Sequence, residues 1–194
     1  MKLVAKDSFY AVIDEVLPQE QFDMFWKYFN NSDYAYRSMT GWQKVWRITD
    51  GQVLAGPPSY HSQAPFNSPL DILHQSAMAL AKQHFEEIVG KEDEDWKEFF
   101  LTPYIYPAGT KISWHDDYGY TGACIYYTHP EWGANWGGEL FIAKTPSSQE
   151  IQQNNIAPDH ITREFIDPLL NHHGMGMYFT PKPNRMIFTS GKVW

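Results

Sequence analysis

The sequence predicts an α+β fold that is mainly β, with two helices near the N-terminus supporting a β-barrel or sandwich. The first observation behind this prediction is that apolar residues recur at helical spacing only in the first half of the chain. The second is that short runs of strand-forming residues alternate with Gly, Pro and Asn turns from Phe99 onward. A length of 194 residues is enough for a substantial core, so we expect a single domain over residues 1–194.

The helices are predicted by their apolar faces and by their ends. Four aromatic residues spaced i, i+3, i+4 and i+7 predict a helix that starts after Pro18 and stops at residues 30–32. These aromatic residues are Phe22, Phe25, Trp26 and Phe29. A second helix is predicted from about Ser68 to Val89, and Gly90 ends it.

Strands are predicted on both sides of these helices. Residues 8–17 contain a run of strand formers ahead of the first helix. The later strands are expected at residues 99–106, 111–114, 121–127, 139–143, 175–179 and 186–189. Residues 36–67 are expected to form a long irregular loop, whose Trp42 and Trp46 either cover a substrate or pack beneath the loop. A short helix is expected near residues 163–170.

The composition narrows the classes of partner and compartment. A net charge of −8 argues against non-specific nucleic-acid binding and against an anionic membrane surface. Cys124 is the single cysteine, so an intrachain disulfide framework is excluded and a buried, small apolar role is expected. No signal peptide and no window of 18 apolar residues is present. We therefore expect a cytoplasmic protein that binds neither nucleic acid nor membrane.

The most informative short motif is His115-Asp116-Asp117. Residues i and i+2 of an extended backbone point to the same side, so His115 and Asp117 can converge on one ion while Asp116 points away. One imidazole and one carboxylate, joined by a second His from elsewhere, form the facial triad of non-haem Fe(II) oxygenases. A triplet of this kind is common by chance, so its neighbours decide how much it means.

Further motifs surround this triplet in a fixed order. The segment Tyr106-Pro107-Ala108-Gly109 precedes it, and the segments Tyr126-Tyr127, Gly137-Gly138-Glu139-Leu140 and Asn184-Arg185-Met186-Ile187-Phe188 follow it. Together they resemble the Fe(II)/2-oxoglutarate-dependent dioxygenases, specifically the prolyl-hydroxylase-like branch. The resemblance covers residues 99–144 and 183–194. It implies a double-stranded β-helix, or jelly-roll, with supporting N-terminal helices.

The resemblance implies roles at the matching positions. His115 and Asp117 match the first two iron ligands and are the implied catalytic pair. Tyr127 matches a tyrosine that hydrogen-bonds 2-oxoglutarate, and Tyr106 matches a tyrosine near the cosubstrate or substrate. Arg185 matches a residue of its strand and not the arginine that grips the cosubstrate. The implied cofactors are Fe(II) and 2-oxoglutarate, with ascorbate as a possible addition.

Two members of the family pattern have no counterpart in this chain. The distal His and the cosubstrate Arg would follow Trp194, so we expect the chain to be a fragment that lacks its last strands. An intact mass near 22.6 kDa would contradict this expectation. His172 and His173 are alternative third ligands, although their loop-like context beside Gly174 favours turn histidines. His129 and His160 are weaker candidates.

The function expected from the resemblance is hydroxylation of a C–H bond in an amino acid, a peptidyl residue or a small metabolite. Related halogenases have Gly or Ala where this chain has Asp117, so Asp117 favours hydroxylation. Two other classes stay open: a non-catalytic jelly-roll that binds a small molecule or peptide, and a cupin-like metalloprotein that does not use 2-oxoglutarate. No P-loop, Rossmann fingerprint or Gly-x-Ser-x-Gly elbow supports another enzyme class.

Overall fold

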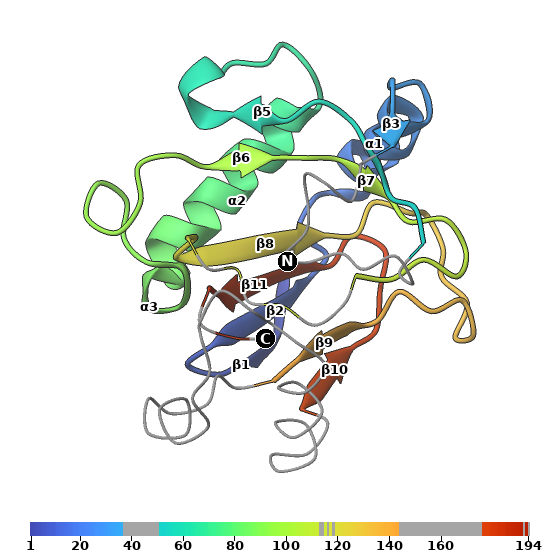
Figure 1. The fold of residues 1–194 in the computed structure, drawn as a ribbon. Helices are drawn as coiled ribbons and strands as arrows, with labels where there is room; N and C mark the ends of the chain where they lie inside the picture. Colours follow the sequence, from blue (N-terminus) through green and yellow to red (C-terminus); the bar gives the residue numbers. More distant parts are fainter. Residues whose placement is uncertain are drawn as a thin grey trace.

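The computed structural model describes residues 1–36, 51–112, 115, 117, 119–143, 176–191 and 193. These residues form a mixed α/β fold whose sheets are antiparallel (Figure 1). Several sequence predictions lie outside the described residues. They are the predictions for Trp42, Trp46, Asp116, His160, the helix at 163–170, His172 and His173.

The main sheet has four antiparallel strands in the order β1-β2-β11-β8. Its strands are β1 (Lys2–Lys6), β2 (Tyr10–Asp14), β11 (Met186–Ser190) and β8 (Gly122–Tyr126). Ile187 of β11 lies opposite Val12 of β2 on one side and Ile125 of β8 on the other. Residues from the two ends of the chain therefore form the centre of the sheet, and every residue of β2 and β11 is buried.

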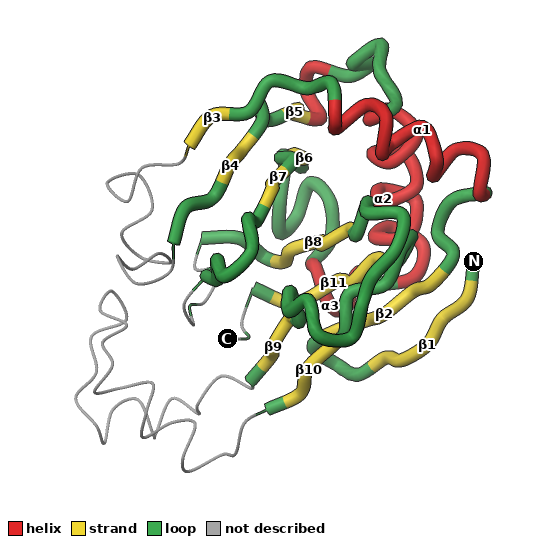
Figure 2. Tube along the Cα trace, turned by 90° about the vertical axis from the view of Figure 1, so that its right-hand side faces the viewer, coloured by secondary structure: helices red, strands yellow, loops and turns green. Residues whose placement is uncertain are grey.

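The two faces of this sheet carry separate apolar clusters. Ala11, Ile13, Met186 and Phe188 alternate onto the face that packs against the helices. These helices are α1 (Gln19–Asn30), α2 (Leu70–His84) and α3 (Glu86–Val89), and Figure 2 shows α1 and α2 on one side of the sheet. The opposite face buries Tyr10, Val12 and Ile187 with Ile142 and Phe179 of the pair β9 (Leu140–Ile142) and β10 (Met177–Phe179).

The helices differ from their prediction in two places. The second helix is not continuous to Val89, because Phe85 leaves helical geometry at φ −136° and ψ 21° and separates α2 from α3. The Phe85 ring is buried and lies 5.1 Å from the ring of Phe188, so packing on the sheet accompanies the break. In α1, Phe22 and Phe25 are buried as predicted, whereas Trp26 is 42% exposed and does not belong to the core face.

Tyr36 and the described residues 51–67 and 99–106 include short paired strands, which corrects the predictions of an irregular loop and of one continuous strand there. The strands β3 (Ala35–Tyr36), β4 (Leu54–Ala55) and β7 (Tyr104–Ile105) make one sheet, and β5 (Ser59–Tyr60) pairs with β6 (Phe100–Leu101). The expected single strand at 99–106 is split at Pro103, which has no N–H to donate, while its carbonyl accepts the N–H of Gly56 at 2.9 Å. Lys111 and Ile112, expected in a strand, are irregular.

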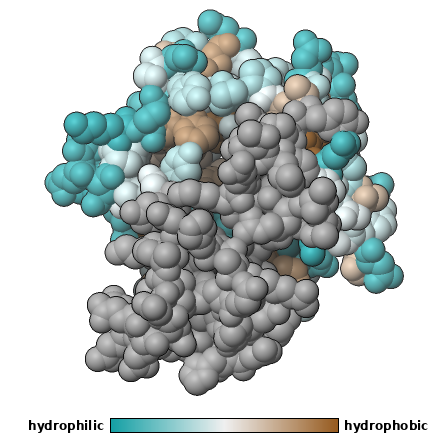
Figure 3. Space-filling view, viewed as in Figure 1, coloured by the Kyte–Doolittle hydropathy of each residue, from teal (hydrophilic) through white to brown (hydrophobic). Residues whose placement is uncertain are grey.

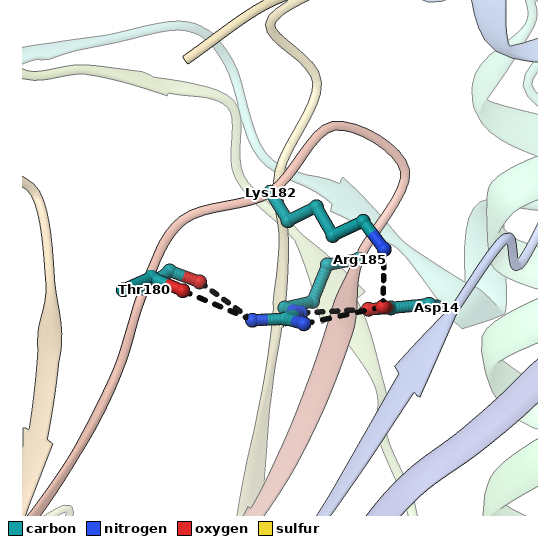
Figure 4. Close-up of polar contacts among 4 residues, drawn as sticks. All are labelled: Asp14, Thr180, Lys182 and Arg185. Atoms are coloured by element: carbon teal, nitrogen blue, oxygen red, sulfur yellow. Dashed lines mark hydrogen bonds and ion pairs between the residues drawn. The ribbon is translucent and has the colours of Figure 1, made fainter. Parts of the chain in front are cut away.

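A polar junction joins the end of β2 to the start of β11. The Asn184 side-chain oxygen accepts the N–H of Leu17 at 3.0 Å and the hydroxyl of Tyr126 at 2.8 Å, and its amide donates to the Leu17 carbonyl at 2.7 Å. Asn184 has φ 60°, a conformation that Asn tolerates better than most residues. The next residue, Arg185, forms a two-point ion pair with the buried carboxylate of Asp14, which Lys182 also contacts (Figure 4).

Candidate functional site

His115 and Asp117 converge, as their spacing predicts. The Nε2 atom of His115 lies 3.8 Å from Oδ1 of Asp117, and the side chains are 27% and 37% exposed. Both residues lie in irregular backbone before β8 and not in a strand, so the convergence does not depend on a regular ladder. Two donors held at about 2.1 Å from one octahedral ion would stand about 3 Å apart. The Nε2–Oδ1 separation therefore has to shorten by less than about 1 Å for both atoms to bind one ion, which small side-chain movements can achieve.

A third ligand is not found within the part of the chain that the structure describes. No group of three or more His, Cys, Asp or Glu residues there is arranged to hold a metal ion. His61 and His74 contact each other, with Nδ1 and Nε2 3.2 Å apart, and His84 lies against Phe85. None of these three histidines forms a group of metal-binding residues with His115 and Asp117 in the described part of the chain.

Tyr127 is fixed through its backbone to the Asn184–Arg185 junction. Its N–H donates to the carbonyl of Arg185 at 3.0 Å, and its carbonyl accepts the N–H of Asn184 at 3.1 Å. The side chain packs with the cluster on the face of the sheet opposite the helices. Burial raises the pKa of Tyr127 to about 12, against a lowering effect of Arg185. The phenol therefore stays protonated at neutral pH and can donate a hydrogen bond.

Tyr106 lies close to Tyr104 and Tyr127. The ring centroids of Tyr104 and Tyr106 are 6.2 Å apart, so these two side chains lie on the same side of the segment. Burial raises the pKa of the Tyr106 phenol, and the neighbouring phenols of Tyr104 and Tyr127 raise it further. The Tyr106 residue as a whole is nevertheless 45% exposed, so part of its surface stays open to solvent. Tyr106 and Tyr127 thus present two neutral hydroxyl donors.

His129, a weaker candidate for the third ligand in the sequence, lies beside Tyr127 and not against His115 in the contacts that the structure describes. Its ring lies 5.9 Å from that of Tyr127 and 4.6 Å from that of Trp132, which in turn contacts Trp136. The Nε2 atom of His129 is buried and has no hydrogen-bond partner among the described residues. Burial lowers the pKa of His129, so the ring is held neutral. The tight turn with Pro130 concealed this contact in the sequence, because it depends on how the turn folds back on the strand.

Cys124 behaves as predicted. It packs with Tyr126 against the helix-side cluster, whereas Tyr127 packs on the other face. Burial raises the pKa of the Cys124 thiol to about 12, so no thiolate forms at neutral pH. This residue is therefore a core residue and not a nucleophile or a metal ligand.

An open groove of about 410 Å³ lies on the described surface. It lies at the C-terminal end of α1 and contains none of the candidate site residues. Its lining residues are Met24, Lys27, Tyr28, Asn31, Ser32 and Pro69.

Comparison with known proteins identifies no relative of this chain: no family model, no curated protein and no solved structure matches it. Among the described residues, no helix is long and apolar enough to cross a membrane. The functional argument therefore depends on the residues themselves and on their geometry.

Proposed function

We propose that this protein is an Fe(II)- and 2-oxoglutarate-dependent oxygenase that hydroxylates a C–H bond of an amino-acid, peptidyl or small-metabolite substrate. The observation that carries the proposal is the convergence of His115 Nε2 and Asp117 Oδ1 at 3.8 Å. The sequence motifs around this pair resemble those of the oxygenase family. The two-layer packing of the main sheet against β9 and β10 is compatible with the jelly-roll that we propose as its fold.

The described residues fit iron as part of a ligand set. A neutral imidazole nitrogen and a carboxylate oxygen are the donors that Fe(II) takes in facial-triad sites. When bound, the iron would supply the activation of dioxygen that couples oxidation of 2-oxoglutarate to substrate hydroxylation. His115 and Asp117 would hold the ion. The third ligand would come from outside the described residues: it is the distal His expected after Trp194, with His172, His173 and the weaker His160 as alternatives.

The tyrosines suit an anionic cosubstrate. A carboxylate needs hydrogen-bond donors that carry no negative charge of their own. Burial keeps the phenol of Tyr127 protonated, with a pKa of about 12, and the raised pKa of Tyr106 has the same effect. The backbone hydrogen bonds to Asn184 and Arg185 hold Tyr127 in position, so its hydroxyl can bind and orient a carboxylate without reorganisation.

The experiment that tests the metal site measures binding as well as turnover. Anaerobic titration with Fe(II) and 2-oxoglutarate should give a visible charge-transfer band, and calorimetry with Co(II) should give one site per chain. Asp117→Ala should abolish both signals, whereas Asp93→Asn, a substitution at an exposed carboxylate in the segment between α3 and β6, should leave them unchanged. Absence of both the charge-transfer band and succinate formation in the full-length protein would refute the proposal and would favour a non-catalytic binding module.

A second experiment addresses the cosubstrate. Tyr127→Phe removes one hydrogen-bond donor without changing the ring, so the concentration of 2-oxoglutarate needed for half-maximal succinate formation should rise about tenfold. Tyr178→Phe, at a 63% exposed position on β10, is the matched control. An unchanged requirement in Tyr127→Phe would favour a metalloprotein that does not use 2-oxoglutarate.

A further inference from the structure

Three exposed aromatic rings form a row on the surface beside the candidate site. Tyr60 of β5, Phe100 of β6 and Tyr120, two residues before β8, are 37%, 36% and 57% exposed. The ring centroids of Tyr60 and Phe100 are 5.6 Å apart, and those of Phe100 and Tyr120 are 5.8 Å apart. We call these three residues the aromatic row. Exposed aromatic surface of this kind is typical of binding sites when it is contiguous.

The aromatic row reaches the candidate metal ligands through the backbone. The N–H of Tyr120 donates to the carbonyl of Asp117 at 2.8 Å, so one end of the row is tied to a candidate iron ligand. The other end lies where β5 and β6 pair, with Tyr60 opposite Phe100. The Tyr120 end of the aromatic row therefore lies three residues along the chain from Asp117, and its backbone is hydrogen-bonded to that residue.

An acidic segment lies beside the aromatic row. Residues 91–98, which we call the acidic loop, contain five carboxylates and two lysines. The carboxyl oxygen of Glu98 accepts the N–H of Ser62, two residues after Tyr60, at 3.2 Å. At the other end, a Cβ placed on Gly90 would meet Asp95 at 2.8 Å and Thr121 at 3.2 Å, so Asp95 lies close to the residue that follows Tyr120.

In the acidic loop, Glu92 is ion-paired with Lys82 and Glu94 with Lys91, so Asp95 and Glu98 are the carboxylates that matter for binding a cation. The indole N–H of Trp96 donates to the Gly90 carbonyl at 2.9 Å and closes the loop. Asp95 and Glu98 are exposed and accept backbone N–H groups, which leaves their charge in place. In Figure 3, a hydrophobic area over β6 lies beside a hydrophilic lobe at the left of the molecule.

We infer that the aromatic row and the acidic loop together bind an extended, positively charged polypeptide segment, which is the substrate class of the neighbouring site. Same-side residues of an extended peptide are spaced about 6.6 Å apart, close to the ring separations along the row. Lysine and arginine side chains of such a segment would form favourable charge interactions with the carboxylates and cation–π interactions with the ring faces. A free amino acid spans only one ring interval. The inference names the substrate of the function proposed above and so rests on it.

The test measures peptide binding without iron or 2-oxoglutarate. A short fluorescein-labelled peptide that alternates lysine with leucine should bind and should be released by added salt. The same peptide with Gln in place of Lys should bind at least about tenfold more weakly, since several surface charge pairs are lost. A peptide with Glu in place of Lys should not bind. Equal binding of the three peptides would overturn the inference.

Substitutions locate the binding surface. Tyr120→Ala and Glu98→Gln should each weaken binding about two- to fivefold, because each removes one exposed cation–π or charge contact. Tyr120→Phe should retain binding because the ring remains. Tyr178→Ala on β10 and Glu20→Gln on α1 are the controls and should have no effect. Unchanged far-ultraviolet circular dichroism is required of each variant. Unchanged affinity in folded Tyr120→Ala would overturn the inference.

The two proposals fail in different ways. Peptide binding without metal binding or succinate formation would refute the oxygenase proposal and would support the peptide-binding surface. Succinate formation with free amino acids, together with no binding of the lysine peptide, would support the oxygenase proposal and would refute the peptide-binding surface. Asp117→Ala should lose metal and keep peptide affinity.

Discussion

Replacement of Asp14 by Asn is expected to destabilise the fold more than any surface substitution. The Asp14 carboxylate accepts hydrogen bonds from Nε and Nη2 of Arg185 at 2.7 and 3.2 Å and from Nζ of Lys182 at 2.6 Å (Figure 4). Its side chain is 5% exposed and that of Arg185 is 12% exposed, whereas that of Lys182 is 50% exposed. Asp14→Asn leaves the guanidinium buried without a counter-ion.

The magnitude follows from these exposures. Removal of one partner from a buried ion pair costs about 3–5 kcal/mol, and a half-exposed pair such as Lys182 with Asp14 contributes less than about 1 kcal/mol. Asn keeps one acceptor, so we expect a loss of about 3 kcal/mol in the free energy of unfolding. For a domain of this size, that loss lowers the melting temperature by about 9 °C. Urea unfolding followed by circular dichroism measures it.

Two controls separate the buried pair from its surroundings. Lys182→Met should cost less than about 1 kcal/mol, because its ammonium is half-exposed. The double variant Asp14→Asn with Arg185→Gln should be more stable than the sum of the single effects predicts, by at least about 1 kcal/mol. A loss below about 0.5 kcal/mol in Asp14→Asn, or additive effects in the double variant, would refute the reasoning.

The same ion pair makes the free energy of unfolding depend on pH in the acid range. Burial alone would raise the pKa of Asp14, but the hydrogen bonds and charges of Arg185 and Lys182 outweigh burial and lower it below 3.8. The unfolded state therefore binds the proton more readily, so the contribution of Asp14 is fully present above pH 3.8 and is lost as the pH falls through the folded-state pKa. The Asn variant should lack this part of the acid transition.

Three further outcomes are expected. Burial is the main cause that lowers the pKa of His74 below 6.5, so stability should fall as the pH drops from 6.5 towards the folded-state pKa. His74→Phe should reduce this dependence of stability on pH in urea melts. An unchanged dependence would contradict the role of His74. Gly122→Ala should cost about 1–3 kcal/mol because the new Cβ would meet the Val89 backbone at 2.7 Å, whereas Gly133→Ala meets only the movable Trp136 ring; equal melting temperatures would contradict this difference. Phe188→Ala should cost about 3–5 kcal/mol by urea unfolding, since its ring is 1% exposed; a loss near 1 kcal/mol would mean that the core collapses around it.

The long, locally patterned elements were predictable. The run of strand formers before Leu17 forms β2, and the segment with regularly spaced aromatic residues forms α1. The predicted strands at 121–127 and 186–189 correspond to β8 and β11, with ends that agree within about one residue. Gly90, with φ 82°, ends the helical segment as predicted. The contact between His115 and Asp117 was also predictable, because residues i and i+2 of an extended backbone point to the same side.

The elements that depend on distant partners were not predictable. β1 has lysine at both ends and no buried face, so its sequence shows no alternation of apolar and polar residues. It is a strand because it pairs with β2. The two-residue strands β3 to β7 carry too few residues for a period. The contact of His61 with His74, and the role of Asn184 in holding Leu17, arise from tertiary packing alone.

The central position of β2 and β11 has a consequence for the order in which the protein folds. Asp14 and Arg185 are separated by 171 residues, and Leu17 and Asn184 by 167. On a ribosome, β2 is synthesised well before β11 and must wait for this partner strand. The contacts of highest sequence separation thus close the sheet last, which predicts slow folding and an early intermediate whose β2 edge is open to pairing with other chains.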